Sequence, residues 1–181
     1  MPDEARLERA GNGLTPVSDG WFVLNARDAA WLRHETFGLR CRFELNGPVA
    51  RSRDDLEPRT FPLLGIGITV LQPGQPSTLY HEEPGDQEDF LVLSGECRAV
   101  IEDEERALRQ WDFVHCPPGT AHSFVGAGDG PCVLLTVGSR TGGGVRYHPT
   151  PLAESVDAET SSGADAYAPY GHWVNDGVSP L

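Results

Sequence analysis

The fold is decided by two stretches, GQPSTLYHEEPGDQEDFLVLSGE (residues 74–96) and WDFVHCPPGTAHSF (residues 111–124). They hold His81 and Glu83, two residues apart, then Glu88 at the start of an apolar run, and His122 after a Pro-Pro-Gly turn. Side chains two residues apart in a strand share a face, so His81 and Glu83 are predicted to point the same way. Nitrogen and oxygen ligands that converge from separate strands inside a barrel make a site for a divalent metal.

The chain around these stretches is a series of short apolar runs separated by Gly or Pro. The predicted strands are residues 63–71, 78–82, 88–93, 97–101, 106–109, 113–116, 122–125 and 132–137. Many short strands at close spacing are typical of an all-β sandwich or barrel. The sequence shows no internal repeat, which favours one barrel over two.

The flanking segments are expected to be simpler. Residues 1–19 are predicted to be a loose N-terminal arm, and the barrel is placed at 20–140. Within it we expect a strand at 20–24, a brief helix from its N-cap Asn25 to Gly38, a strand at 39–45 and a charged surface loop at 49–60. The tail, 141–181, is acidic and aromatic, and it is predicted to pack on the barrel or on a partner subunit.

The two stretches resemble the two signature blocks of the cupin superfamily. The residues that carry the resemblance are Gly74, His81, Glu83, Glu88 and Gly95 in the first block, and Pro117, Gly119 and His122 in the second. The likeness is greatest to stand-alone, single-barrel cupins of bacteria. It implies a double-stranded β-helix, that is, a jelly-roll barrel, with short extensions at both ends.

The same resemblance implies a divalent metal held by His81, Glu88 and His122. Glu83 stands where the block usually has its second His, so it is expected to be a fourth ligand, a general base or an orienting group. Ligands without sulfur suit iron, manganese, nickel, cobalt or zinc and do not separate them. The alternative is a barrel that is merely lined by these polar groups.

Alternation along the run that begins at Glu88 indicates the form of the pocket. If Glu88 faces inward, Phe90 and Val92 do too, and His122 shares its face with Phe124. We therefore expect an apolar pocket with polar groups at one end, a common form for small-molecule sites.

The opposite face of that run is also apolar, because it carries Leu91 and Leu93. It is expected to pack on another sheet or on a second subunit. Together with the aromatic tail, it predicts a homodimer.

Other residues were weighed for catalysis. Tyr80, next to His81, is a candidate to move a proton together with Glu83. His115 is expected to be packed or at a solvent edge and not a ligand. Ser94 and Ser123 lack the surroundings of a nucleophile elbow, which argues against a serine hydrolase.

Charge excludes several partners. The chain has 14 basic and 27 acidic residues, for a net charge of −13, which disfavours nucleic acid and anionic membranes. All the basic residues are Arg, so Schiff-base and pyridoxal phosphate chemistry and a P-loop lysine are excluded.

The cysteines and the N-terminus bear on location. Cys41, Cys97, Cys116 and Cys132 lie in apolar runs without a C-x-x-C pair, so buried free thiols are expected. The N-terminus is polar, and the longest apolar stretch, 61–71, is too short to span a bilayer. These features predict a cytoplasmic protein.

Three classes of function stay open at this point. The first is a metal-dependent enzyme, an oxygenase, decarboxylating enzyme or isomerase, acting on a small oxygenated organic molecule. The second is a non-catalytic binder of a small molecule or metal, and the third a metal-free sugar isomerase or epimerase. The fold alone cannot choose among them.

Overall fold

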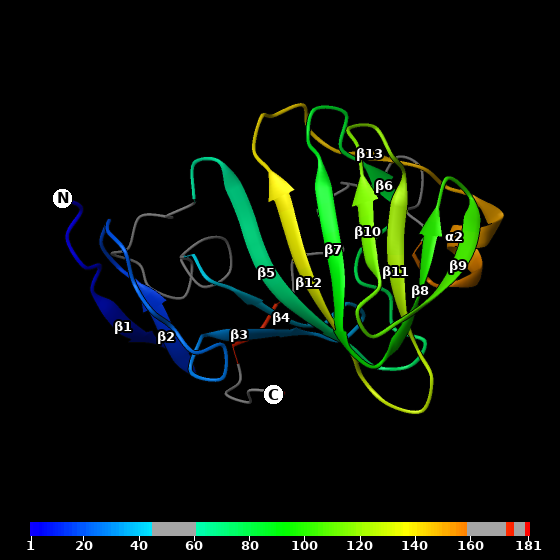
Figure 1. The fold of residues 1–181 in the computed structure, drawn as a ribbon. Helices are drawn as coiled ribbons and strands as arrows, with labels where there is room; N and C mark the ends of the chain where they lie inside the picture. Colours follow the sequence, from blue (N-terminus) through cyan, green and yellow to red (C-terminus); the bar gives the residue numbers. More distant parts are fainter. Residues whose placement is uncertain (45–60, 159–172, 176–179) are drawn as a thin grey trace.

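Antiparallel strands are the main regular structure of the described residues (Figure 1). The structure is a computed structural model that describes residues 1–44, 61–158, 173–175 and 180–181. The all-β jelly-roll fold expected from the sequence is confirmed, with two large sheets that enclose the core. No helix within the described ranges is long and apolar enough to cross a membrane.

The larger sheet has six strands in the order β10-β7-β12-β5-β4-β3. Its strands are β3 (Trp31–His34), β4 (Gly38–Arg42), β5 (Leu64–Leu71), β7 (Glu88–Ser94), β10 (Phe113–Cys116) and β12 (Cys132–Ser139). β12 lies at the centre, where Leu135 pairs with Ile68 of β5 on one side and with Leu91 of β7 on the other. In this register the inward-facing side chains of β5, β7 and β12 lie on the same side of the sheet.

The second sheet has five strands in the order β13-β6-β11-β8-β9. Its strands are β6 (His81–Glu82), β8 (Glu96–Ile101), β9 (Glu104–Arg109), β11 (His122–Ala127) and β13 (Arg146–Tyr147). β6 and β11 pair at His81 and His122, which therefore lie side by side. Two residues 41 positions apart in the sequence meet because these two strands are neighbours.

The core lies between the two sheets. Phe90 and Val92 of β7 are buried there, as the alternation predicted, and they pack against Phe124 of β11 and Ala99 of β8. Burial of an apolar side chain of this size contributes about 1.5–3 kcal/mol. All four cysteines are free and buried, which confirms the expectation of buried thiols.

The outer faces of the sheets are covered by different segments. Helix α2 (Pro151–Ser155), capped by the Thr150 side chain, packs through Ala153 on the outer face of the five-stranded sheet. On the six-stranded sheet, Leu93 packs in an outer cluster with Trp31 and its neighbours. Leu93 therefore finds its cover within its own chain.

Two predictions for the N-terminal part were wrong. Residues expected to form a loose arm make a hairpin of β1 (Leu7–Ala10) and β2 (Gly13–Pro16). The predicted helix starting at Asn25 is absent from the described residues: the Asn25 side chain accepts a hydrogen bond from the Arg27 backbone N–H, as an N-cap does, but the chain makes only a turn before β3. Trp31 is then 1% exposed in strand β3, where burial against the sheet outweighs the local capping signal.

Two smaller differences remain. The expected strand at 20–24 is reduced to a single bridge between Trp21 and Glu4. The expected surface loop at 49–60 lies outside the described residues.

Candidate metal centre

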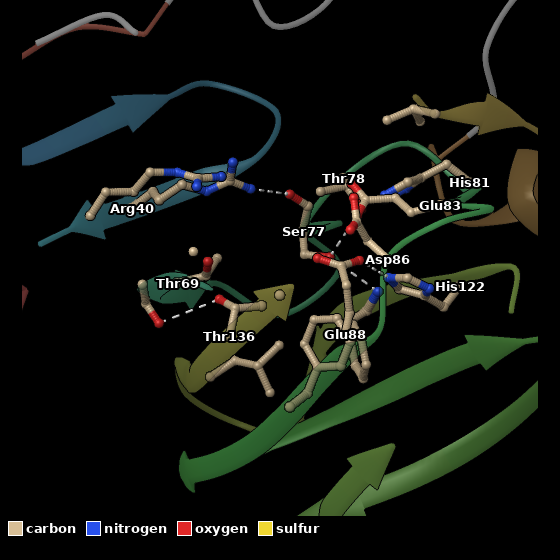
Figure 2. A pocket seen from close by; sticks show the side chains of 18 of the residues that line it. Arg40, Thr69, Ser77, Thr78, His81, Glu83, Asp86, Glu88, His122 and Thr136 are labelled. Carbon is tan, nitrogen blue, oxygen red and sulfur yellow. Dashed lines mark hydrogen bonds and ion pairs between the residues drawn. The ribbon is translucent and has the colours of Figure 1, made fainter. Parts of the chain in front are cut away.

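Three of the four predicted ligands meet at one end of the barrel. His81 and His122 come from adjacent strands of the five-stranded sheet, and Glu88 begins β7 of the opposite sheet. One ligand atom from each lies within 4.8 Å of the other two. Figure 2 shows their side chains directed toward one another at one side of the pocket. The group can hold a metal ion and bridges the two sheets.

The backbone fixes the orientation of both imidazole rings. His81 Nδ1 lies 2.7 Å from the carbonyl oxygen of Leu79, and His122 Nδ1 lies 3.0 Å from that of Thr120. A carbonyl oxygen only accepts hydrogen bonds, so Nδ1 carries the proton in each ring. Each ring therefore presents Nε2 to the site. Metal-binding histidines in proteins are oriented in this way.

Glu88 and His122 form an ion pair between Oε2 and Nε2, 2.9 Å apart. Burial favours the neutral imidazole of His122, but the hydrogen bond and charge of Glu88 raise its pKa above the ordinary value. Burial and the neighbouring His122 lower the pKa of His81. A proton thus lies between Glu88 and His122 when no metal is bound.

Glu83 lies outside this group of three but lines the same cavity. It follows β6 directly, and its carbonyl oxygen accepts a hydrogen bond from the Gly119 N–H. Burial, followed by the charge of Glu88, raises the pKa of Glu83 to about 7. A carboxyl group of this kind exchanges a proton near neutral pH.

Tyr80 is placed elsewhere. It does not line the cavity, and its hydroxyl accepts a hydrogen bond of 2.7 Å from the Asp103 backbone N–H. Its ring packs with Ala153 of α2 on the outer side of the five-stranded sheet. The prediction that Tyr80 acts beside Glu83 therefore has no support in the geometry. Tyr80 and its neighbour His81 face opposite ways, as adjacent residues of extended chain do.

Residues 67–138 match the model of the family described as "Cupin domain". This stretch of the chain is therefore identified as a cupin domain. A search among curated proteins found no match.

Solved structures with a similar fold include several from bacteria. A provisionally assigned sugar phosphate isomerase from Acidithiobacillus ferrooxidans is 26% identical, with a TM-score of 0.45 over 61% of this chain and 65% of that one. A cupin superfamily sugar phosphate isomerase from Silicibacter pomeroyi is 25% identical, with a TM-score of 0.46 over 61% of this chain and 66% of that one. A predicted oxalate decarboxylase from Thermotoga maritima is 17% identical, with a TM-score of 0.51 over 65% of this chain and 98% of that one. This chain spans just under two thirds of the length of the first two proteins.

The cavity beside these ligands has a volume of about 580 Å³. Phe90, Phe124 and Leu134 form apolar parts of its lining. Small residues on β5 and β12, among them Gly67 and Gly138, leave the interior open. A Cβ atom at Gly138 would lie 3.2 Å from a carboxylate oxygen of Glu88, so this position also makes room for the candidate ligand.

The C-terminal segment forms part of the cavity wall. Tyr147 of β13 lines it, with a ring centroid 6.1 Å from that of His81. Trp173 also lines it and stacks on Arg40, whose guanidinium carbon lies 5.0 Å from the ring centroid. The described parts of the tail therefore pack on their own barrel. Tyr167 and Tyr170 lie outside the described residues.

Asp86 holds the segment that follows β12. Its Oδ1 accepts hydrogen bonds from the Thr141 backbone N–H (2.6 Å), the Thr141 hydroxyl (2.8 Å) and the Ser139 hydroxyl (3.1 Å). Burial would raise the pKa of Asp86, but these hydrogen bonds lower it below its ordinary value. Gly142, next in the chain, has a φ of 87° and lines the cavity.

Three arginines of the cavity lining were missed by the sequence analysis, namely Arg40, Arg42 and Arg140. A signal for two of them is present in the stretch LRCRFE (residues 39–44), where polar and apolar residues alternate. Alternation places Arg40, Arg42 and Glu44 on one face of that strand. The third, Arg140, follows β12 and carries no motif.

Proposed function

We propose that this protein is a metal-dependent enzyme acting on a small oxygenated organic molecule, with His81, Glu88 and His122 as the metal ligands. The observation that carries the proposal is the arrangement of two backbone-oriented imidazoles and one carboxylate within 4.8 Å of one another. Two histidines and one carboxylate on one side of a metal leave open positions for a substrate. The donor set suits iron, manganese, nickel, cobalt or zinc.

A bound divalent metal supplies Lewis-acid activation of a substrate oxygen, or oxygen chemistry when the metal is iron. The protein's own residues have separate tasks. Glu83, beside the ligands and with a pKa of about 7, accepts or donates the proton. Phe90 and Phe124 line the cavity next to His122 and limit the access of water.

Metal content tests the ligand assignment. Protein purified without added metal is analysed for its elements, alongside His122→Ala, which is expected to lose most of the metal. His115→Ala is the matched control, because His115 also pairs with a carboxylate, Asp89, at 2.6 Å but lies half-exposed outside the cavity. Full metal content in a His81→Ala, His122→Ala double variant would refute the proposal.

Turnover separates an enzyme from a binding protein, since both share the metal and the pocket. A panel of small acids and phenols is incubated with metal-loaded protein, with and without oxygen, and followed by mass spectrometry. Glu83→Gln is expected to bind ligand and lose turnover. Ligands that stay unchanged with every metal of the set favour the non-catalytic binder.

We further propose that the protein forms a homodimer. The outer side of the six-stranded sheet exposes Phe113 (62%), and Trp111 (67%) lies just before that strand. Leu91 pairs directly with Phe113, so the apolar surface continues across two strands. Sedimentation is expected to give twice the chain mass of 19.6 kDa, and a monomer at micromolar concentration contradicts the proposal.

A further inference from the structure

One wall of the cavity is basic. β4 contributes Arg40 and Arg42, which share its inner face, whereas Cys41 between them packs in the outer cluster. Arg140 lines the cavity from the segment after β12. Figure 2 shows Arg40 on the side of the pocket opposite the imidazole of His122. The candidate metal ligands and the arginines therefore belong to different ends of one cavity.

Two of these arginines share one buried carboxylate. The Glu44 side chain is 1% exposed and pairs with Arg140 and, at 3.9 Å, with Arg42. The three groups together carry one net positive charge. In addition, Arg140 Nε is buried and has no hydrogen-bond partner among the described residues. A buried donor without a partner is costly, and the wall also keeps a net positive charge that an anionic ligand can neutralise.

The structure keeps space beside this wall. A Cβ atom at Gly65 would lie 3.0 Å from an Arg140 guanidinium nitrogen, so glycine leaves that guanidinium room. Thr69 and Thr136 also line the cavity and add hydroxyl groups. A cavity of about 580 Å³ is in the range that holds small organic ligands.

Arg42 is close enough to both ends to sense the charges of each. Burial lowers the pKa of its guanidinium, and Arg140 adds to this effect. Glu44 on one side and Glu88 and Glu83 on the other act in the opposite direction. Charged groups at both ends of the cavity therefore act on Arg42.

We propose that Arg42 and Arg140 bind an oxyanion of the substrate, a carboxylate or a phosphate. A second oxygen of the same molecule then faces the candidate metal ligands, and this part of the inference rests on the proposed metal-dependent function. Guanidinium groups bind both kinds of oxyanion through paired, charge-assisted hydrogen bonds. The substrate class is a small organic anion with a further oxygenated group.

Calorimetric titration of the metal-free protein tests the oxyanion site directly. The probes are succinate and inorganic phosphate, at low ionic strength. Arg42→Gln is expected to weaken binding by about tenfold or more, because a charged hydrogen-bond donor of the cavity wall is lost. Glu44→Gln is expected to strengthen it severalfold, because it removes the competing carboxylate and the net charge of the wall rises.

Arg106→Gln is the matched control. It removes one positive charge from an exposed position on β9, outside the cavity, and is expected to bind the probes as the wild type does. A merely structural role of the wall would weaken binding in both the Arg42 and the Glu44 variants. Opposite signs in the two variants thus support a ligand site even when either variant loses some stability.

Each outcome decides the matter. Binding of succinate alone assigns a carboxylate, binding of phosphate alone assigns a phosphate, and binding of both supports the oxyanion site without a preference. No binding of either probe to the wild type, or weakening in Glu44→Gln, overturns the inference. Metal content is measured separately: if His122→Ala keeps its metal while the anion results hold, the proposed function fails and the oxyanion site stands.

Discussion

Replacing Glu44 by glutamine removes a buried negative charge while keeping an oxygen that accepts the hydrogen bond from the Phe61 backbone N–H. The substitution therefore isolates the charge. Glu44 is 1% exposed, whereas its partners Arg140 and Arg42 are 30% and 38% exposed. The arginines regain water after the substitution, but the attraction to the carboxylate is lost.

The size of the expected destabilisation follows from two opposing electrostatic effects, the attraction between the charges and their desolvation. Two unit charges about 4 Å apart attract by about 4 kcal/mol at the effective dielectric near a protein surface. Desolvation of the buried carboxylate offsets a large part of the attraction to both arginines. We expect a net loss of about 2 kcal/mol in the free energy of unfolding, which for a chain of this size lowers Tm by about 4–8 °C.

Urea unfolding and thermal scans of the metal-free protein measure the effect. Glu104→Gln is the control, because Glu104 also pairs with an arginine, Arg106, but both side chains are 63% exposed. That variant is expected to change stability by less than about 0.5 kcal/mol. Equal stability of the Glu44 and Glu104 variants would refute the reasoning that burial gives the Glu44 pairs their strength.

Three further predictions concern other parts of the molecule. Phe124→Ala is expected to lower the free energy of unfolding by about 3–5 kcal/mol in urea titrations, because this side chain is 1% exposed between the sheets; Val23→Ala, at a side chain that is 83% exposed, should cost far less. Phe113→Glu is expected to sediment as a monomer, while Arg106→Glu keeps the dimer, and a dimeric Phe113→Glu contradicts the proposed interface. In metal-free protein the pKa of Glu83 is raised from 4.5 to about 7, so folded protein keeps a proton that the unfolded chain loses, and stability falls as pH rises between these values. Glu83→Gln should therefore stabilise the protein more at pH 8 than at pH 5. The difference in the free energy of unfolding is at most about 3 kcal/mol, and partial solvent screening makes it smaller. A difference that does not change with pH argues against the raised pKa.

The strands after Phe61 could be predicted from short-range patterns, whereas the convergence of His81 with His122 was predicted from the resemblance to the two cupin blocks. Period-two alternation placed Phe90 and Val92 inside, and the motif resemblance brought His81, Glu88 and His122 to one site. The same alternation argues against Tyr80 as a partner of His81, because adjacent residues of a strand face opposite sides.

The parts of the fold and of the candidate site that the sequence did not predict depend on contacts between distant segments. Asn25 has the chemistry of a helix cap, yet Trp31 is buried against Ile68 and Val70 of β5, and this tertiary contact decides the local structure. The shared inward face of Arg40 and Arg42 can be predicted from the alternation of polar and apolar residues in their strand. The approach of Arg140 to Glu44 cannot, because it depends on β12, β5 and β4 being neighbours in the sheet.

The two ends of the cavity come from different parts of the chain. The candidate metal ligands, residues 81, 88 and 122, all lie within the stretch that matches the cupin domain, 67–138. Arg40, Arg42 and Arg140, by contrast, lie outside it, as do Tyr147 and Trp173. The proposed oxyanion wall can therefore change by substitutions outside residues 67–138 while the stretch with the three candidate metal ligands stays the same.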